Sequence, residues 1–221
     1  MDWRAWHEDY ADPESALGRR LAVVQRQVRH ALDDAPPGPV RVISVCAGQG
    51  HDLLGVLAEH PRCEQVTARL VELDEHNATQ AQATIREAGL AQVEVAIADA
   101  SITDAYVGAV PADLVLVCGV FGNISRADIA STIANLPRLT APAATVIWTR
   151  HRHPPDATPY IRETFAREGF EELAFEDSPP FGVGVNRLDA PPKPFERCVR
   201  LFEFVGYDVL EPEFHARASR G

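Results

Sequence analysis

The sequence has little positive charge and no long apolar run. Its formal net charge is −11, and Lys193 is its single lysine. A field of this sign repels polyanions, so we expect no nucleic acid partner. No run approaches the roughly 20 apolar residues that a bilayer span needs, and residues 1–14 are acidic and aromatic, unlike a signal peptide. We therefore predict a cytoplasmic protein with no membrane partner.

The four cysteines show neither a C-x-x-C pair nor the spacing of metal ligands. They are Cys46, Cys63, Cys118 and Cys198. Cys46 and Cys118 end apolar, strand-like runs, which is typical of buried free thiols in a cytosolic protein. We accordingly expect no zinc site.

The chain has the size of one large α/β domain. Its 221 residues can bury a substantial core, and no repeat or linker divides them into independent units. We predict an N-terminal helical cap over residues 1–36, a core over residues 40–207 and a frayed tail over residues 208–221.

The N-terminal cap is predicted from the helical spacing of its apolar residues. Trp3, Trp6 and Tyr10 share one face of a short helix, where a lid over a ligand and plain packing are both compatible with the pattern. A longer helix is expected over residues 15–33, and the proline-rich residues 36–39 end it.

From residue 40 onward, strand-like and helix-like stretches alternate. This alternation predicts a Rossmann-like, doubly wound, mostly parallel sheet with helices on both faces. Residues 181–187 are read only as a short extended piece. The expected strands are residues 40–46, 65–72, 93–98, 112–118, 145–149, 170–175 and 200–205, and the expected helices are residues 51–59, 74–88, 102–107, 125–136 and 156–168.

A glycine turn follows the first expected strand, at the sheet edge where such folds bind ligands. Gly48-Gln49-Gly50 lets the backbone approach a ligand closely, although a purely structural turn has the same pattern. A dinucleotide-binding turn needs a third glycine three residues later, where this chain has Leu53. The pattern therefore indicates a nucleotide-type ligand and disfavours NAD.

Acidic residues end the second and third expected strands. The carboxylate of Glu72 can accept both ribose hydroxyls of a nucleoside, and a solvated charge at the strand end is the alternative. Asp99 can accept from the exocyclic amine of adenine, and an N-cap for the next helix is the alternative. Together the two acids favour a nucleoside-containing cofactor.

These features resemble the class I S-adenosylmethionine-dependent methyltransferases. The resemblance covers about residues 40–205 and implies that the glycine turn holds the methionine part of the cofactor, Glu72 the ribose and Asp99 the adenine. It also implies S-adenosyl-L-methionine as cofactor, S-adenosyl-L-homocysteine as product, and an antiparallel last strand at residues 200–205. The matching residues are Cys46, Ala47, Gly48, Gln49, Gly50, Glu72, Leu73, Asp99, Ala100, Cys118 and Gly119.

Several departures from that family narrow the expected chemistry. Ser44 stands where the family often has an acid, and Cys46 where it usually has glycine, so the carbonyl of Gly119 is a candidate contact for the methionine amino group. The D-P-P-Y signature of amine-methylating members is absent after the fourth strand, and so are the acids that bind magnesium in catechol-type members. We therefore predict no metal and no methylation of exocyclic base amines.

Candidate catalytic residues follow the fourth and fifth expected strands. His151 and His153 suit a general base or, with their arginine neighbours, a clamp for an anionic substrate; a solvated basic loop is the alternative. Asn123 can line the methyl-transfer pocket or close a turn. Residues 181–187 are a candidate substrate wall.

We predict methyl transfer from S-adenosylmethionine to a small-molecule acceptor, at oxygen or nitrogen. An NAD(P)-dependent oxidoreductase is the first alternative, and it is weakened by Leu53 and by the lack of a catalytic Tyr/Lys pair. A non-catalytic protein that binds S-adenosylmethionine or S-adenosylhomocysteine is the second. A homodimer is a possible assembly.

Overall fold

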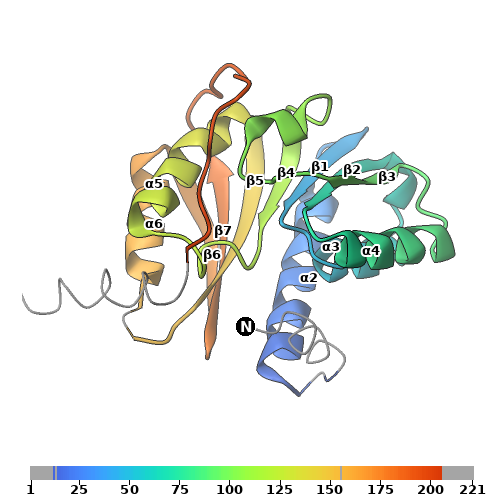
Figure 1. The fold of residues 1–221 in the computed structure, drawn as a ribbon, viewed down its shortest axis with the longest axis horizontal. Helices are drawn as coiled ribbons and strands as arrows, with labels where there is room; N and C mark the ends of the chain where they lie inside the picture. The colour runs from blue at the N-terminus through green and yellow to red at the C-terminus, as the bar shows by residue number, and fades with distance from the viewer. Residues whose placement is uncertain (1–11, 13, 155, 206–221) are drawn as a thin grey trace, which may run out of the picture.

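The computed structural model describes residues 12, 14–154 and 156–205, and its centre is a seven-stranded sheet of order β3-β2-β1-β4-β5-β7-β6 (Figure 1). Within the described chain only β7 runs antiparallel to the other strands. The predicted Rossmann-like, mostly parallel sheet is therefore confirmed. The strands are β1 (Val40–Val45), β2 (Val66–Glu72), β3 (Val93–Ile97), β4 (Ala112–Val117), β5 (Thr140–His151), β6 (Phe170–Ser178) and β7 (Phe181–Leu188).

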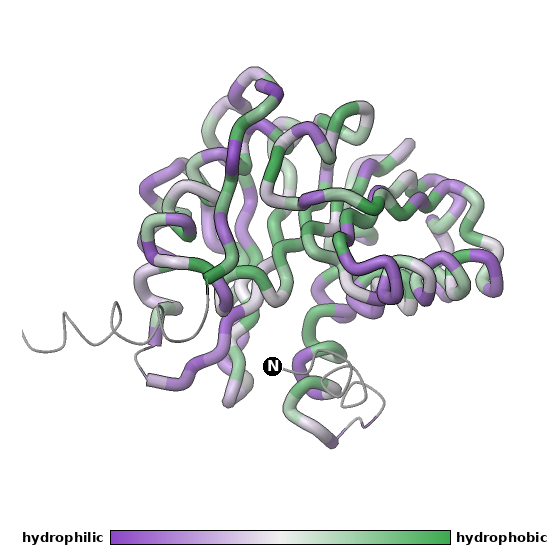
Figure 2. Tube along the Cα trace, in the orientation of Figure 1, coloured by the Kyte–Doolittle hydropathy of each residue, from purple (hydrophilic) through white to green (hydrophobic). Residues whose placement is uncertain are grey.

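Helices cover both faces of this sheet, as predicted (Figure 1). Buried β4 side chains alternate between the two cores: Leu114 and Leu116 pack on one face, Val115 and Val117 on the other. Figure 2 shows the hydrophobic residues gathered in the central strands. One face of the sheet carries α2 (Ala16–Asp34), α3 (His51–Leu57) and α4 (Glu75–Glu87). The other face carries α5 (Arg126–Asn135) and α6 (Thr158–Arg167). The short 3-10 helices are η2 (Cys63–Gln65), η3 (Thr103–Tyr106) and η4 (Leu136–Arg138).

Helix α2 begins and ends within one residue of the predicted bounds, 15 and 33. The hydroxyl of Ser15 caps it by accepting from the N–H of Gly18 at 2.8 Å. At the C-terminal end of α2, the guanidinium of Arg62 donates to four backbone carbonyls, those of Leu32, Ala35, Pro36 and Gly38. These bonds fix the proline-rich connection to β1. Trp3, Trp6 and Tyr10 lie outside the described residues.

None of the helices in the described part of the chain combines the length and the apolar character of a membrane span.

The predicted last strand at residues 200–205 is wrong, and the antiparallel strand is β7. Residues 181–187, read as a short extended piece, form most of β7, which pairs with β5 on one side and β6 on the other. Their glycines hide the strand, because glycine has low strand propensity. A Cβ atom on Gly184 would lie 2.2 Å from the buried ring of Trp148, so close packing requires glycine there.

Strand β5 is also longer than predicted. The expected residues 145–149 extend to Thr140 at one end and His151 at the other. His151 therefore belongs to the sheet, paired with Phe181 of β7, whereas the sequence analysis placed it just after the strand.

Residues 199–205, which we call the strap, cross the loops that follow β3 and β4. The N–H of Leu201 donates to the carbonyl of Ser101 at 2.7 Å, and the N–H of Val205 donates to the carbonyl of Asn123 at 3.0 Å. Phe202 anchors the strap in the core with 1% of its surface exposed. The strap makes only isolated bridges, so its apolar residues pack on loops and do not add a strand to the sheet.

Candidate functional site

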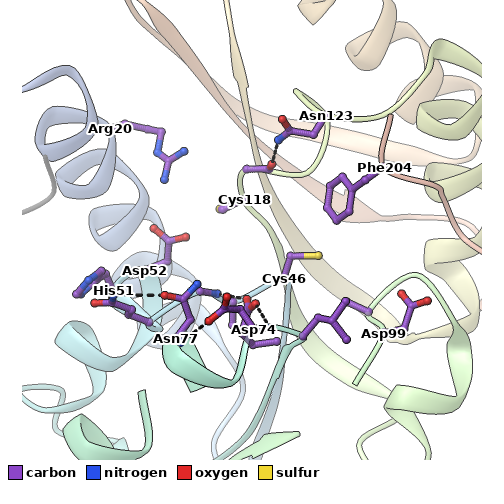
Figure 3. Close-up of a pocket in the computed structure, with 17 residues that line it drawn as sticks. Arg20, Cys46, His51, Asp52, Asp74, Asn77, Asp99, Cys118, Asn123 and Phe204 are labelled. Carbon is purple, nitrogen blue, oxygen red and sulfur yellow. Dashed lines mark hydrogen bonds between the residues drawn. The ribbon is translucent and has the colours of Figure 1, made fainter. Parts of the chain in front are cut away.

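A cavity of about 610 Å³ lies at the carboxyl ends of β1, β2, β3 and β4 (Figure 3). It brings together every residue to which the sequence analysis gave a cofactor role except Gly50, and it includes the catalytic candidate Asn123. Its remaining walls come from α2, α3, α4 and the strap. The sequence-predicted residues that line it are Cys46, Ala47, Gly48, Gln49, Glu72, Leu73, Asp99, Ala100, Cys118, Gly119 and Asn123.

The turn after β1 takes left-handed backbone conformations at Cys46 (φ 51°), Gly48 (φ 56°) and Gly50 (φ 78°). Gly50 lies behind the cavity wall, where an added Cβ atom would stand 2.7 Å from the side chains of Leu54 and Leu70. Its role in the turn is therefore one of conformation and packing.

Cys46 holds the same left-handed conformation with a side chain, which is uncommon outside glycine, Asn and Asp. Burial raises the pKa of its thiol far above the usual range, and the negative charges of Glu72 and Asp99 raise it further. The thiol is thus neutral at physiological pH and shapes the cavity without acting as a nucleophile.

Glu72 holds the turn after β1 against the end of β2. Its Oε2 accepts from the N–H of Gly48 at 2.7 Å, and its Oε1 accepts from the N–H of Asp74 at 2.8 Å. The carboxylate is half-buried and oriented on the cavity, which is more order than a solvated strand-end charge requires.

Asp99 lines the cavity and is not the N-cap of the next helix. Its Oδ1 accepts from the N–H of Ser101 at 2.9 Å, whereas Ile102 is the N-cap of η3. The exposed side chain of Leu73, 67% of it accessible, lies on the same cavity and offers an apolar surface beside the two acids.

Asn123 closes a turn and faces the cavity at the same time. Its Nδ2 donates to the carbonyl of Gly119 at 2.7 Å, and its own N–H donates to the carbonyl of Val120 at 2.9 Å (Figure 3). The N–H of Gly119 donates to Oγ1 of Thr149 at 2.9 Å, which ties the loop to β5.

His151 and His153 do not line the cavity. His151 lies behind the loop after β4, with its Cδ2 atom 3.5 Å from the position of a Cβ atom on Gly122. Burial lowers the pKa of His151 to about 4, and the positive charges of Arg150 and His153 lower it further. Its Nδ1 atom is buried and has no hydrogen-bond partner among the described residues. At pH 7 the ring is therefore a neutral imidazole.

The arginine next to it takes part in ion pairs. Arg152 pairs with Asp156 at 2.8 Å and with Asp177. Its charge is thus largely matched within the protein, which makes a clamp for an anionic substrate at this position a weaker interpretation.

Sequence reasoning missed six residues that line the cavity: Arg20, His51, Asp52, Asp74, Asn77 and Phe204. Arg20 is 3% exposed although it is an arginine, and it stands three residues after Leu17 and four before Val24 on the buried face of α2. An arginine within an apolar stripe is a signal that the sequence offered. Phe204 is 53% exposed and reaches the cavity from the strap, which no local pattern indicates.

No cluster of three or more His, Cys, Asp or Glu side chains suited to a metal ion occurs in the described residues.

A family model described as "Putative methyltransferase" matches residues 17–167 of the sequence. The chain belongs to this methyltransferase family. The match begins in α2 and ends with α6, so it contains the glycine turn and the acids at the ends of β2 and β3. No curated protein matches the sequence.

Solved structures of methyltransferases share the fold of this family member. The magnesium protoporphyrin IX methyltransferase of Synechocystis PCC 6803, with bound S-adenosylmethionine, has a TM-score of 0.64 at 14% identity and covers 85% of this chain and 91% of its own. An O-methyltransferase family protein of Burkholderia thailandensis has a TM-score of 0.59 at 16% identity, covering 81% and 61%. The predicted resemblance to class I S-adenosylmethionine-dependent methyltransferases is confirmed by family and fold.

A protein with another named activity has the same fold. The [4+2]-cyclase SpnF has a TM-score of 0.56 at 15% identity and covers 78% of this chain and 81% of its own. Because one fold serves more than one reaction, function has to be argued from the cavity itself.

Proposed function

We propose that this protein transfers a methyl group from S-adenosylmethionine to oxygen or nitrogen of a small molecule. One observation carries the proposal: the residues that follow four neighbouring strands, chosen from sequence for a nucleoside cofactor, line one cavity. Ligands of open α/β sheets bind at this edge.

The residues of the cavity fit such a cofactor. Glu72, already oriented by two backbone N–H groups, is suited to accept the ribose hydroxyls. Asp99 is suited to accept the adenine amine, with Leu73 against the apolar base. The left-handed turn at Gly48 exposes backbone close to the space left for the methionine part. When bound, S-adenosylmethionine supplies a sulfonium methyl group that is transferred by in-line displacement.

The protein contributes mainly alignment and the exclusion of water. Asn123 holds the loop after β4 in place through Gly119, and Phe204 of the strap adds an apolar wall beside it. We propose His151, a neutral imidazole, as the general base for a hydroxyl acceptor; because it lies behind this loop and does not line the cavity, one bridging water has to carry the proton to it. Its low pKa makes it a modest base, so alignment contributes more than proton transfer.

Calorimetric titration with S-adenosylhomocysteine tests the cofactor, with NADH and NADPH as controls. We expect micromolar binding of the thioether and no binding of either nicotinamide nucleotide. Binding of NADH or NADPH in its place would support the oxidoreductase alternative in spite of Leu53. Tight binding of the thioether without transfer to any acceptor in a broad screen would favour a non-catalytic binding protein.

The acceptor, the homodimer and the cytoplasmic location stay predictions of the sequence. A small molecule is favoured over nucleic acid because the chain carries a net charge of −11.

A further inference from the structure

Two side chains of opposite charge share one corner of the cavity. Arg20 reaches it from α2 and Asp52 from the first turn of α3, and Figure 3 shows both directed into the space beside Cys118. Both charges act on this thiol: Asp52 raises the pKa of Cys118, which burial already raises, and Arg20 lowers it. The corner therefore holds a cationic group and an anionic group around the end of β4.

The side chain of Arg20 is buried and packed against an aromatic ring. Only 3% of its surface is exposed, and its guanidinium carbon lies 5.5 Å from the ring centroid of Phe181 in β7. A cation on an aromatic face keeps its hydrogen-bonding edge directed elsewhere. A buried guanidinium that lines a cavity is suited to a planar anion such as a carboxylate.

Asp52 presents an acceptor that the described residues do not use. Its Oδ1 atom is buried and accepts no hydrogen bond from any of them. An unsatisfied buried carboxylate oxygen is costly, so a donor from a ligand would stabilise it.

Two other candidate acceptors for an ammonium group, Ser44 and the carbonyl of Gly119, are less suited to this role than a carboxylate. Ser44, at a position where an acid is common, is a neutral and buried hydroxyl. The carbonyl of Gly119 already accepts from Nδ2 of Asn123. The other acids of the cavity have roles elsewhere: we place Glu72 at the ribose and Asp99 at the adenine, and Asp74 caps α4 by accepting from the N–H of Asn77 at 3.0 Å. Asp52 is thus the acid in this corner with an oxygen to offer.

We propose that Arg20 and Asp52 form a site for an α-amino-carboxylate: Arg20 binds the carboxylate and Asp52 the ammonium group. This inference rests on the proposed function, because the methionine end of S-adenosylmethionine is such a group. The site makes α2 part of the cofactor-binding surface and replaces the missing acid at Ser44.

The test compares two ligands that differ only in this group and the methylene that carries it. S-adenosylhomocysteine carries the amino-carboxylate, and 5′-methylthioadenosine has the same nucleoside and thioether without it. We expect Arg20→Met and Asp52→Asn each to weaken S-adenosylhomocysteine at least tenfold by calorimetry, and to leave 5′-methylthioadenosine within twofold. Arg19→Met, on the exposed side of the same helix, and Glu59→Gln, just after α3, are matched controls that should change neither ligand.

A third ligand separates recognition from damage to the fold. Decarboxylated S-adenosylhomocysteine should bind the wild type at least tenfold more weakly than the complete thioether, and Arg20→Met should show no such difference. Equal weakening of S-adenosylhomocysteine and 5′-methylthioadenosine, or unchanged binding of both, overturns the amino-carboxylate site alone. A wild type that binds neither ligand overturns the proposed function together with this site.

Discussion

The two halves of the cavity are built in different ways. In the half formed by β1, β2 and β3, the lining residues end a strand or follow it within a few residues, so neighbours in space are also neighbours in a short sequence pattern. In the other half, Arg20, Asn123 and Phe204 come from a helix, a loop and the strap, more than 80 residues apart at each step. The first half is thus dictated locally, whereas the second depends on tertiary packing.

The largest expected effect comes from a substitution in the turn after β1, in the half of the cavity formed by β1, β2 and β3. Gly50 and Gly89 both have left-handed backbones, but an added Cβ atom meets Leu54 and Leu70 at Gly50 and nothing within 4 Å at Gly89. Both leucines are fully buried and cannot move aside cheaply. We expect Gly50→Ala to lower the free energy of unfolding by about 2–4 kcal/mol, as overpacking adds to backbone strain. Gly89→Ala should cost about 1 kcal/mol. Urea denaturation measures both, and equal losses would refute the packing argument.

A smaller effect is expected when one negative charge is removed from the half of the cavity formed by β1, β2 and β3. Glu72→Gln takes away an acceptor oriented on the cavity, so we expect the dissociation constant of S-adenosylhomocysteine to rise by about 30-fold, in line with a charge-assisted hydrogen bond. The control is Glu94→Gln on β3, whose carboxylate pairs with Arg69 at 2.6 Å outside the cavity. That variant should bind within twofold of the wild type. Similar losses in the two variants would remove Glu72 from the cofactor site.

The smallest effect concerns His151, in the half that depends on packing. Folding lowers the pKa of this ring from 6.5 to about 4, so the unfolded chain binds a proton more readily between these values. The stability that the neutral ring contributes is complete above pH 6.5 and is lost as the pH falls toward 4. We expect NMR titration of the imidazole to give a midpoint near pH 4, and His151→Gln to make the free energy of unfolding fall less steeply over this range. A midpoint near 6.5 would contradict the burial.

The base role of His151 needs an acceptor to test it. His151→Ala should then lower kcat about tenfold or more, while the affinity for S-adenosylhomocysteine stays within twofold. Unchanged turnover would remove this residue from the reaction.

Most of the fold follows from the sequence because parallel strands covered on both faces are continuous apolar runs that end in polar residues. Strand β7 was not predicted, since Gly182 and Gly184 make room for the rings of Phe175 and Trp148, a requirement visible only in three dimensions. The strap was misread for the opposite reason: its buried Leu201 and Phe202 look like a strand but pack on loops.

The same distinction applies to the site. Glu72 and Asp99 are found from their place after a strand, whereas the role of Asp52 depends on which helix faces it across the cavity. His151 was placed beyond the fifth strand because nothing in the sequence marks where β5 ends.

The strap has a consequence for how the two halves communicate. Its backbone bonds join Ser101, two residues beyond Asp99, to Asn123 on the opposite side of the cavity. We therefore expect a molecule that shifts the loop at Asn123 to displace the loop at Asp99 as well, because only residues 201–205 of the strap separate the two hydrogen bonds. Coupling of this kind is reciprocal by thermodynamic necessity, so we expect acceptor and cofactor to alter each other's affinity by the same factor.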